Sequence, residues 1–136
     1  MQPTIDRYLH DKAMDHIDHA LGRPLDPMKE TFRNHYAAGG ALADEMAASP
    51  FWDEGKRHGD MRFFYVNEAG CKALASHLRE IGDCHRAFAV TFEGHTRVVA
   101  ATTRNKARYS YFIDVSDCLP DLTFKDYCKR VAVRLA

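Results

Sequence analysis

Two histidines in the first part of the chain have the spacing of metal ligands. His16 and His19 are three residues apart, so they share one face of a helix, and Asp15 and Asp18 lie beside them. A histidine pair with a carboxylate can bind zinc, but the sequence offers no third ligand at a predictable spacing. The pair also flanks the apolar Ile17, as residues on a helix surface or in a packing seam do. We therefore predict no metal site.

The motifs of the common enzyme classes are missing from the sequence. It contains no G-x-S-x-G, no H-E-x-x-H, no P-loop and no G-x-G-x-x-G. Carboxylate pairs occur at Asp53-Glu54 and at Asp114 and Asp117, but such pairs are common on helix surfaces. A general acid or base would need a shifted pKa in a pocket, which a sequence does not reveal. We predict no catalytic residue, no cofactor and no enzyme activity.

Basic and aromatic residues are interleaved near the start of the last third of the chain: Arg104, Lys106, Arg108, Tyr109, Tyr111 and Phe112. This mixture can hold a nucleic-acid backbone and stack on bases. It is also typical of an amphipathic helix over a sheet, with Tyr111 and Phe112 toward the core and Lys106 and Arg108 toward water. We favour the structural interpretation and keep Arg104, Lys106 and Arg108 as candidate binding residues.

A second candidate surface surrounds a predicted polar turn at residues 56–60. Lys56, Arg57 and Arg62 would lie on the wing of a winged-helix fold, where they could contact phosphate. A helix that reads the major groove needs Arg, Lys, Asn or Gln on its exposed face. The predicted helix at 41–48 carries Asp44 and Glu45 instead, which phosphate would repel. This favours a winged-helix shape used as a scaffold, or contact with duplex DNA through the wing alone.

The charges of the chain cancel in number but not along its length. Nineteen Lys and Arg balance nineteen Asp and Glu, and a neutral chain is a poor non-specific binder of DNA. Residues 1–60 hold seven basic and eleven acidic side chains, whereas residues 61–136 hold twelve and eight. The two halves could meet partners of opposite charge, or the difference could be ordinary scatter on a solvated surface.

Composition places the 136 residues among globular proteins of one domain or two small modules, with 46% hydrophobic and 28% charged side chains. No apolar run approaches the roughly 20 residues that cross a bilayer, and the N-terminus lacks the layout of a signal peptide. The four cysteines form no C-x-x-C pair and are expected to be reduced: Cys71, Cys84, Cys118 and Cys128. We predict a cytoplasmic protein without a membrane partner.

Apolar periodicity and capping residues predict the elements of the first half. A helix is expected over residues 5–21, begun by Thr4 and ended by Gly22, because apolar residues recur every fourth position. Residues 31–38 fit either a short strand or the tail of a helix. Further expectations are a helix at 41–48, another helical turn at Phe51-Trp52 capped by Ser49, a strand at 61–66, and a helix at 68–81 capped by Asn67.

The second half predicts a hairpin followed by helices. Strands at 87–93 and 96–102 flank Gly94-His95, a two-residue loop with glycine first, which favours a type II′ turn. Thr103 and Thr123 would each cap a helix, the first over residues 104–113. Residues 131–135 alternate and predict a closing strand. The order of elements favours an α+β fold.

Three segments resemble small uncharacterised proteins encoded by bacteriophages and prophages: RNHYAA (33–38), FFYVNEAGCKAL (63–74) and TRNKARYSYFIDVSDCLPDLTFKDYCKRVAVR (103–134). The resemblance covers most of the chain, and its closing segment is the most specific part. It implies no catalytic residues. It implies a bacterial host cytosol and a phage accessory role, and such proteins include transcription regulators and inhibitors of host defence.

These observations predict an α+β protein with a winged-helix-like half (1–82) and a ββααβ half (83–136), which could form one compact domain. The function that we expect first is stoichiometric inhibition of a host defence nucleoprotein complex, as anti-CRISPR proteins perform it. The alternative is a winged-helix regulator that binds duplex DNA through Lys56, Arg57 and Arg62. A third possibility is a virion or assembly component that acts as a homodimer or larger homo-oligomer.

Overall fold

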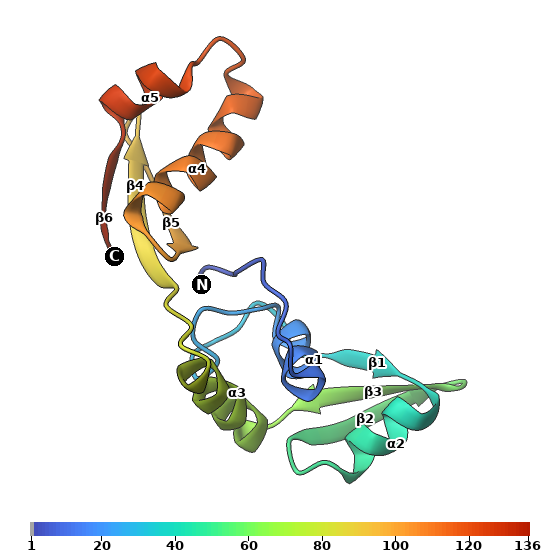
Figure 1. Ribbon diagram of the computed structural model, residues 1–136. Coiled ribbons are helices and arrows are strands. Elements are labelled where there is room, and N and C mark those ends of the chain that lie inside the picture. Colours follow the sequence, from blue (N-terminus) through green and yellow to red (C-terminus); the bar gives the residue numbers. More distant parts are fainter. Residues whose placement is uncertain (1) are drawn as a thin grey trace. The chain divides into compact units, whose positions relative to one another are not determined.

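The computed structural model describes residues 2–136, which fold as an α+β protein (Figure 1). The chain divides into two compact units, residues 1–83 and 84–136, which we call unit 1 and unit 2. Each unit has its own three-stranded antiparallel sheet. The predicted α+β class is confirmed, and the winged-helix description of the first half stays a prediction. No helix within residues 2–136 has the length and apolar character needed to span a bilayer.

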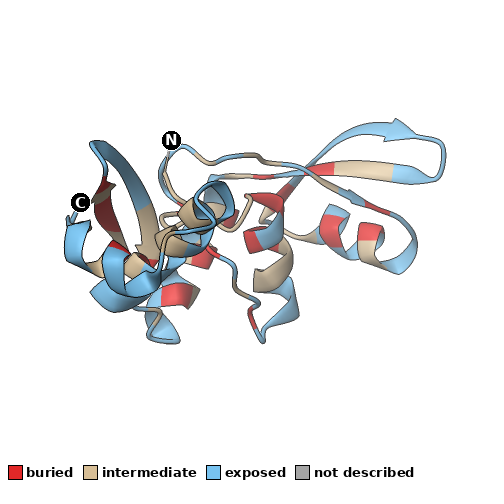
Figure 2. Cartoon of the chain, turned by 90° about the horizontal axis from the view of Figure 1, so that it is seen from above, coloured by how far each residue is buried: buried red, intermediate tan, exposed pale blue. Residues whose placement is uncertain are grey.

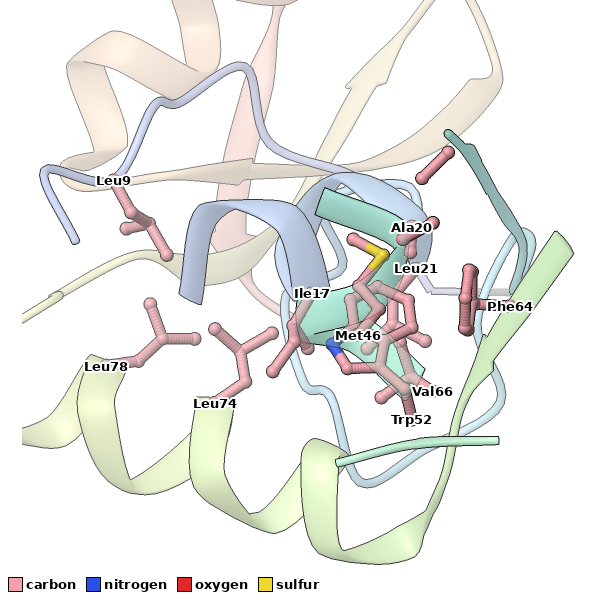
Figure 3. Close-up of a cluster of buried hydrophobic side chains, with 12 residues drawn as sticks. Leu9, Ile17, Ala20, Leu21, Met46, Trp52, Phe64, Val66, Leu74 and Leu78 are labelled. Carbon is pink, nitrogen blue, oxygen red and sulfur yellow. The ribbon is translucent and has the colours of Figure 1, made fainter. Parts of the chain in front are cut away.

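Unit 1 combines a sheet of order β1-β3-β2 with three helices. Its buried core draws on all of these elements and includes Ile17, Leu21, Phe64, Val66 and Leu74 (Figure 3). The elements are α1 (Lys12–Ala20), β1 (Tyr36–Ala38), α2 (Gly40–Ala48), β2 (Trp52–His58), β3 (Met61–Val66) and α3 (Glu68–Glu80). The strand alternative for residues 31–38 is therefore the correct one, although the strand is short.

The first helix begins at Lys12, so the prediction that it starts near residue 5 is wrong. Asp11 caps α1, because its carboxylate accepts a hydrogen bond from the backbone N–H of Met14 at 3.1 Å. Ile5 and Leu9 are buried as their spacing predicted, but in a segment without helical structure. Thr4 does not cap a helix and instead forms an isolated β-bridge with Pro24.

The segment at Phe51-Trp52 is not a helical turn, which corrects another prediction. The Ser49 hydroxyl does accept a hydrogen bond from the backbone N–H of Phe51, but β2 begins at Trp52. The Trp52 ring is buried edge-on against Phe64 of the neighbouring strand. Strand β2 continues to His58 and thus replaces most of the polar turn predicted at residues 56–60. Beyond Trp52 every residue of β2 is exposed (Figure 2).

Helix α3 matches its prediction closely. The Asn67 side chain caps it by accepting a hydrogen bond from the backbone N–H of Gly70 at 3.0 Å. A side chain at Gly70 would place its Cβ 2.5 Å from the carbonyl oxygen of Phe51, so only glycine allows this close approach. Leu74 and Leu78 on the same helix are buried in the core (Figure 3).

Unit 2 has the predicted ββααβ order, and its sheet has the order β5-β4-β6. Its elements are β4 (Arg86–Phe92), β5 (His95–Ala101), α4 (Arg104–Cys118), α5 (Phe124–Arg130) and β6 (Ala132–Leu135). The predicted type II′ turn at Gly94-His95 is wrong, because Phe92 pairs with His95. Glu93 and Gly94 form the turn with φ of 52° and 77°, as a type I′ turn requires.

The helices of unit 2 begin where the sequence predicted. The hydroxyls of Thr103 and Thr123 accept hydrogen bonds from the backbone N–H groups of Lys106 and Asp126. Helix α4 extends to Cys118, beyond the predicted end at residue 113. One buried cluster of unit 2 consists of Phe88, Val90, Ala101 and Ala107, and Ala89, Phe92 and Tyr127 are buried as well.

Candidate nucleic-acid interface

Aromatic side chains from α4, α5 and the end of β4 gather in unit 2. The ring of Tyr127 lies 5.1 Å from those of Phe92 and Phe112, centroid to centroid. Phe124 stands edge-on to Tyr109 at 5.7 Å and to Phe112 at 5.1 Å. The five rings form one continuous cluster that joins α4 to α5.

The centre of this cluster is a structural residue. Tyr127 is fully buried, and its hydroxyl donates a hydrogen bond to the backbone carbonyl of Arg108 at 2.8 Å. Burial raises the pKa of Tyr127 to about 12, since ionisation would place a charge in the apolar interior. The outer edge of the cluster is open to solvent, where Tyr109 is 53% and Phe124 42% exposed.

Lysines without an ion pair to a described residue lie close in sequence to the two exposed rings. Lys106 lies three residues before Tyr109 on α4, a spacing that places both on one side of the helix. Lys125 follows Phe124 directly on α5, so the two side chains leave the helix in directions about 100° apart. Neither lysine forms an ion pair with any carboxylate among residues 2–136. We call Lys106, Tyr109, Phe124 and Lys125 the aromatic–cationic face.

Other candidates in the segment differ from what the sequence predicted. Lys106 is exposed as expected, and Arg104 is also exposed without an ion pair to a described residue. Arg108 is partly buried, and its Nε is buried without a hydrogen-bond partner while one Nη donates to Asn105. The expectation that Arg108 faces water is thus wrong for part of its guanidinium. Tyr111 packs against the core, as predicted.

The hairpin of β2 and β3 holds the other predicted basic residues, but one of them is neutralised. Arg62 donates to both oxygens of Glu54, at 2.6 and 3.2 Å, and to Asp44 at 3.0 Å. The hydrogen bond from Arg62 lowers the pKa of the Glu54 carboxyl. Arg57 also reaches Glu54, at 3.4 Å, while Lys56 is exposed without an ion pair to a described residue.

The two carboxylates predicted on the short helix are both exposed on α2. Asp44 pairs with Arg62, so part of its charge is compensated within unit 1. Glu45 has no ion pair among the described residues and lies at the rim of a hollow of about 300 Å³ that Trp52 and Met46 also line. Glu45 is therefore the more available acidic group of the pair.

A buried ion-pair network in unit 1 was not predicted from the sequence. Asp18 is fully buried and accepts hydrogen bonds from Arg7 at 2.7 and 2.9 Å and from Arg23 at 3.1 Å. Arg7 continues to Asp83 at 3.0 Å, and Arg23 continues to Asp15 at 2.7 Å. Burial raises the pKa of the Asp15 carboxyl, but the hydrogen bonds from Arg23 and from the Leu9 backbone N–H, together with the nearby positive charge, outweigh it, so the net shift is downward.

The histidine pair belongs to a packing seam, as one of the two structural interpretations predicted. The rings of His16 and His19 stand edge-on to Tyr36, with centroids 5.4 and 5.7 Å away. Partial burial and then the charge of Arg33 lower the pKa of the His19 imidazole. Within residues 2–136 no group of three or more His, Cys, Asp or Glu is arranged to hold a metal ion. All four cysteines are free thiols.

A further hollow of about 540 Å³ lies at the connection between α4 and α5. Its lining mixes apolar side chains with two carboxylates and two cations: Leu119, Pro120, Leu122, Asp121, Asp126, Lys129 and Arg130. Arg130 is already engaged, since it pairs with Glu93 at 2.6 Å and lies over the Phe92 ring. The mixed charge gives this hollow no preference for an anion.

Comparisons with protein families, with curated proteins and with solved structures found no match to this chain. The surfaces described above therefore supply the evidence for function. The aromatic–cationic face can contact phosphate through its lysines and stack on planar rings through Tyr109 and Phe124. The sequence had placed Lys106 and Tyr109 in this setting but not Phe124 and Lys125, whose position depends on how α5 packs against α4.

Proposed function

We propose that this protein is a non-enzymatic phage-type accessory protein that inhibits a host defence nucleoprotein complex by binding to it. The observation that carries the proposal is the opposite charge of the two units. Unit 1 has ten basic and fourteen acidic residues, a net charge of −4, and unit 2 has nine and five, a net charge of +4. A complex of nucleic acid and basic protein offers a complementary surface to each.

Unit 2 fits the nucleic-acid part of such a complex. Its cations Arg104, Lys106, Lys125 and Lys129 are exposed and have no carboxylate partner among residues 2–136. Phosphate contacts by such groups release counterions and give affinity that falls steeply with salt. Unit 1 would face the basic protein component, with Glu45 of α2 as an available acidic group.

The alternative function is regulation of transcription through the β2–β3 hairpin. A β-hairpin with exposed Lys56 and Arg57 is present where the wing was expected, which supports this alternative. Arg62 opposes it, because Glu54 and Asp44 already occupy its guanidinium. Phosphate would have to displace both carboxylates, so we rank the regulator second.

The inhibitor proposal is tested in bacteria that carry one defined CRISPR–Cas system directed against a phage. We expect expression of the protein to restore phage plating in strains with the susceptible system. The variant Glu45→Lys should reduce this rescue, because it places a cation against the basic partner. The matched control is Lys29→Glu, which changes the charge of an exposed unit 1 residue in the opposite direction.

Purified components give the decisive result. The protein should co-elute in fixed stoichiometry with the nucleoprotein whose activity it blocks. If no nucleoprotein defence system in a broad panel loses activity, the inhibitor function is rejected. If instead the protein shifts duplex DNA in a salt-dependent manner and Arg57→Glu abolishes the shift, the regulator takes its place.

A further inference from the structure

The exposed rings of unit 2 are held in place by their neighbours. Tyr109 stacks on Phe112 with an angle of 28° between the rings, and Phe124 stacks on Tyr127 at the same angle. Each exposed ring therefore packs against a neighbouring ring in the absence of a ligand. A planar ligand that contacts them loses little affinity to the ordering of these side chains.

Each exposed ring has a cation close to it along the chain. Lys106 precedes Tyr109 by one helical turn, and Lys125 adjoins Phe124. The Asp114 carboxylate of α4 pairs with Arg97 of β5 and not with Lys106. The acidic neighbour on α5, Asp126, accepts no ion pair among the described residues and supplies its backbone N–H to Thr123. The face thus combines stacking surface with free positive charge.

We propose that the aromatic–cationic face binds an unpaired segment of nucleic acid, with bases stacked on Tyr109 and Phe124 and phosphates near Lys106 and Lys125. This inference rests on the proposed function, and names the part of the nucleoprotein that unit 2 contacts. In a duplex the faces of the bases are covered by their neighbours. A protein ring on a helix surface then reaches only the backbone, so stacking selects single strands.

The test measures fluorescence anisotropy of labelled oligonucleotides with the full chain at low and at moderate salt. The probes are a thymidine-rich DNA strand, a uridine-rich RNA strand, the same DNA as a duplex, and a strand of abasic sugar-phosphate. We expect either single strand to bind about tenfold more tightly than the duplex or the abasic strand, from one stacked base or more. The DNA and RNA arms identify which strand is preferred.

Variants separate stacking from charge. Tyr109→Leu and Phe124→Leu keep an apolar contact with the cluster and should each weaken single-strand binding about tenfold while leaving duplex binding unchanged. The matched control is Tyr65→Leu, which removes a ring of similar exposure, 45%, from unit 1. Lys106→Glu and Lys125→Glu alter exposed side chains and should weaken every probe and reduce its salt dependence.

Equal affinity for the abasic and the thymidine strand would overturn the inference, as would equal loss of binding in Tyr65→Leu and Tyr109→Leu. If no oligonucleotide binds but the protein still inhibits a nucleoprotein, this inference fails and the proposed function stands. If the single strand binds as expected but no nucleoprotein is inhibited, the proposed function fails and the site remains.

Discussion

The two units differ in the fraction of their Lys and Arg side chains that form ion pairs within the fold. In unit 1, five of the ten Lys and Arg residues form ion pairs with described carboxylates: Arg7, Arg23, Arg57, Arg62 and Lys72. In unit 2 only two of the nine do, Arg97 and Arg130. Half of the basic residues of unit 1 are thus paired within the fold, whereas most of those of unit 2 have no ion pair to a described carboxylate.

The difference shows why a count of basic residues is a poor guide to a binding surface. Arg62 was a candidate phosphate ligand by type and position, yet its side chain is 15% exposed and contacts two carboxylates. Lys106 has the same formal charge and is exposed without a partner among residues 2–136. Availability, and not charge, separates the two.

The largest expected effect comes from removing the carboxylate at the centre of unit 1. Asp18→Ala would leave Arg7 and Arg23 partly buried without their shared partner. The loss of one member of a buried ion pair costs about 3–5 kcal/mol, so we expect a decrease of that size in the free energy of unfolding. Urea denaturation followed by circular dichroism measures it.

The control for Asp18→Ala is Asp44→Ala, which removes a carboxylate whose side chain is 79% exposed. It should leave the urea midpoint nearly unchanged. Equal destabilisation by both variants would show that burial does not distinguish the two ion-pair groups, and the contrast between paired and available charge would lose its basis.

The next effect concerns the buried tyrosine of unit 2 and depends on pH. In the folded protein the pKa of Tyr127 is about 12, whereas in the unfolded chain it has the ordinary value of 10.0. Between these values the unfolded state binds fewer protons, so stability falls as the pH rises. A shift of this size corresponds to about 2–3 kcal/mol, which is present below pH 10 and lost by pH 12.

Denaturation across that pH range, compared between the native chain and Tyr127→Phe, isolates this contribution. Phenylalanine has no ionisable hydroxyl, so the variant should show a flatter decline of stability with pH. Its stability at neutral pH should drop by about 1 kcal/mol, because the hydrogen bond to the Arg108 carbonyl is lost. Identical pH profiles would contradict a tyrosine held neutral by burial.

Much of the local structure of the chain was predictable because its signals are local. The cap at Asn67, the close-packed Gly70 and the apolar stripe predicted α3 within one residue of its observed end. The start of the first helix was not predictable, because Ile5 and Leu9 fit a repeat at every fourth position and yet are buried without forming a helix. Their conformation is fixed by contacts from distant residues, such as the bridge from Thr4 to Pro24.

The candidate site shows the same limit. Lys106 and Tyr109 stood out in the sequence because they share one helix. Phe124 did not, since its contact with Tyr109 exists only after α5 packs on α4. The ion pair of Arg62 with Asp44 could not be predicted either, because eighteen positions separate the two residues along the chain.

A smaller effect is expected from the exposed ion pair of unit 2. Arg97 and Asp114 are 58% and 52% exposed, and pairs of this kind contribute about 0.2–1 kcal/mol. Arg97→Ala should therefore lower the free energy of unfolding by less than about 1 kcal/mol, and the loss should shrink at high salt. A loss comparable to that of Asp18→Ala would mean that unit 2 also depends on its ion pairs.

The smallest effect on stability is expected at the lysines of the aromatic–cationic face. Lys106→Glu and Lys125→Glu remove no ion pair with a described residue, so thermal unfolding should change by no more than about 0.5 kcal/mol. A clear loss of stability would assign these lysines to the fold and not to a partner.

The most direct measurement of the central claim is a backbone amide NMR titration of the full chain with a short thymidine-rich single strand. We expect shift changes to gather on α4 and α5 around Lys106, Tyr109 and Phe124, while the hairpin with Lys56, Arg57 and Arg62 stays unchanged. Changes that gather instead on the hairpin, with α4 and α5 silent, would contradict the central claim.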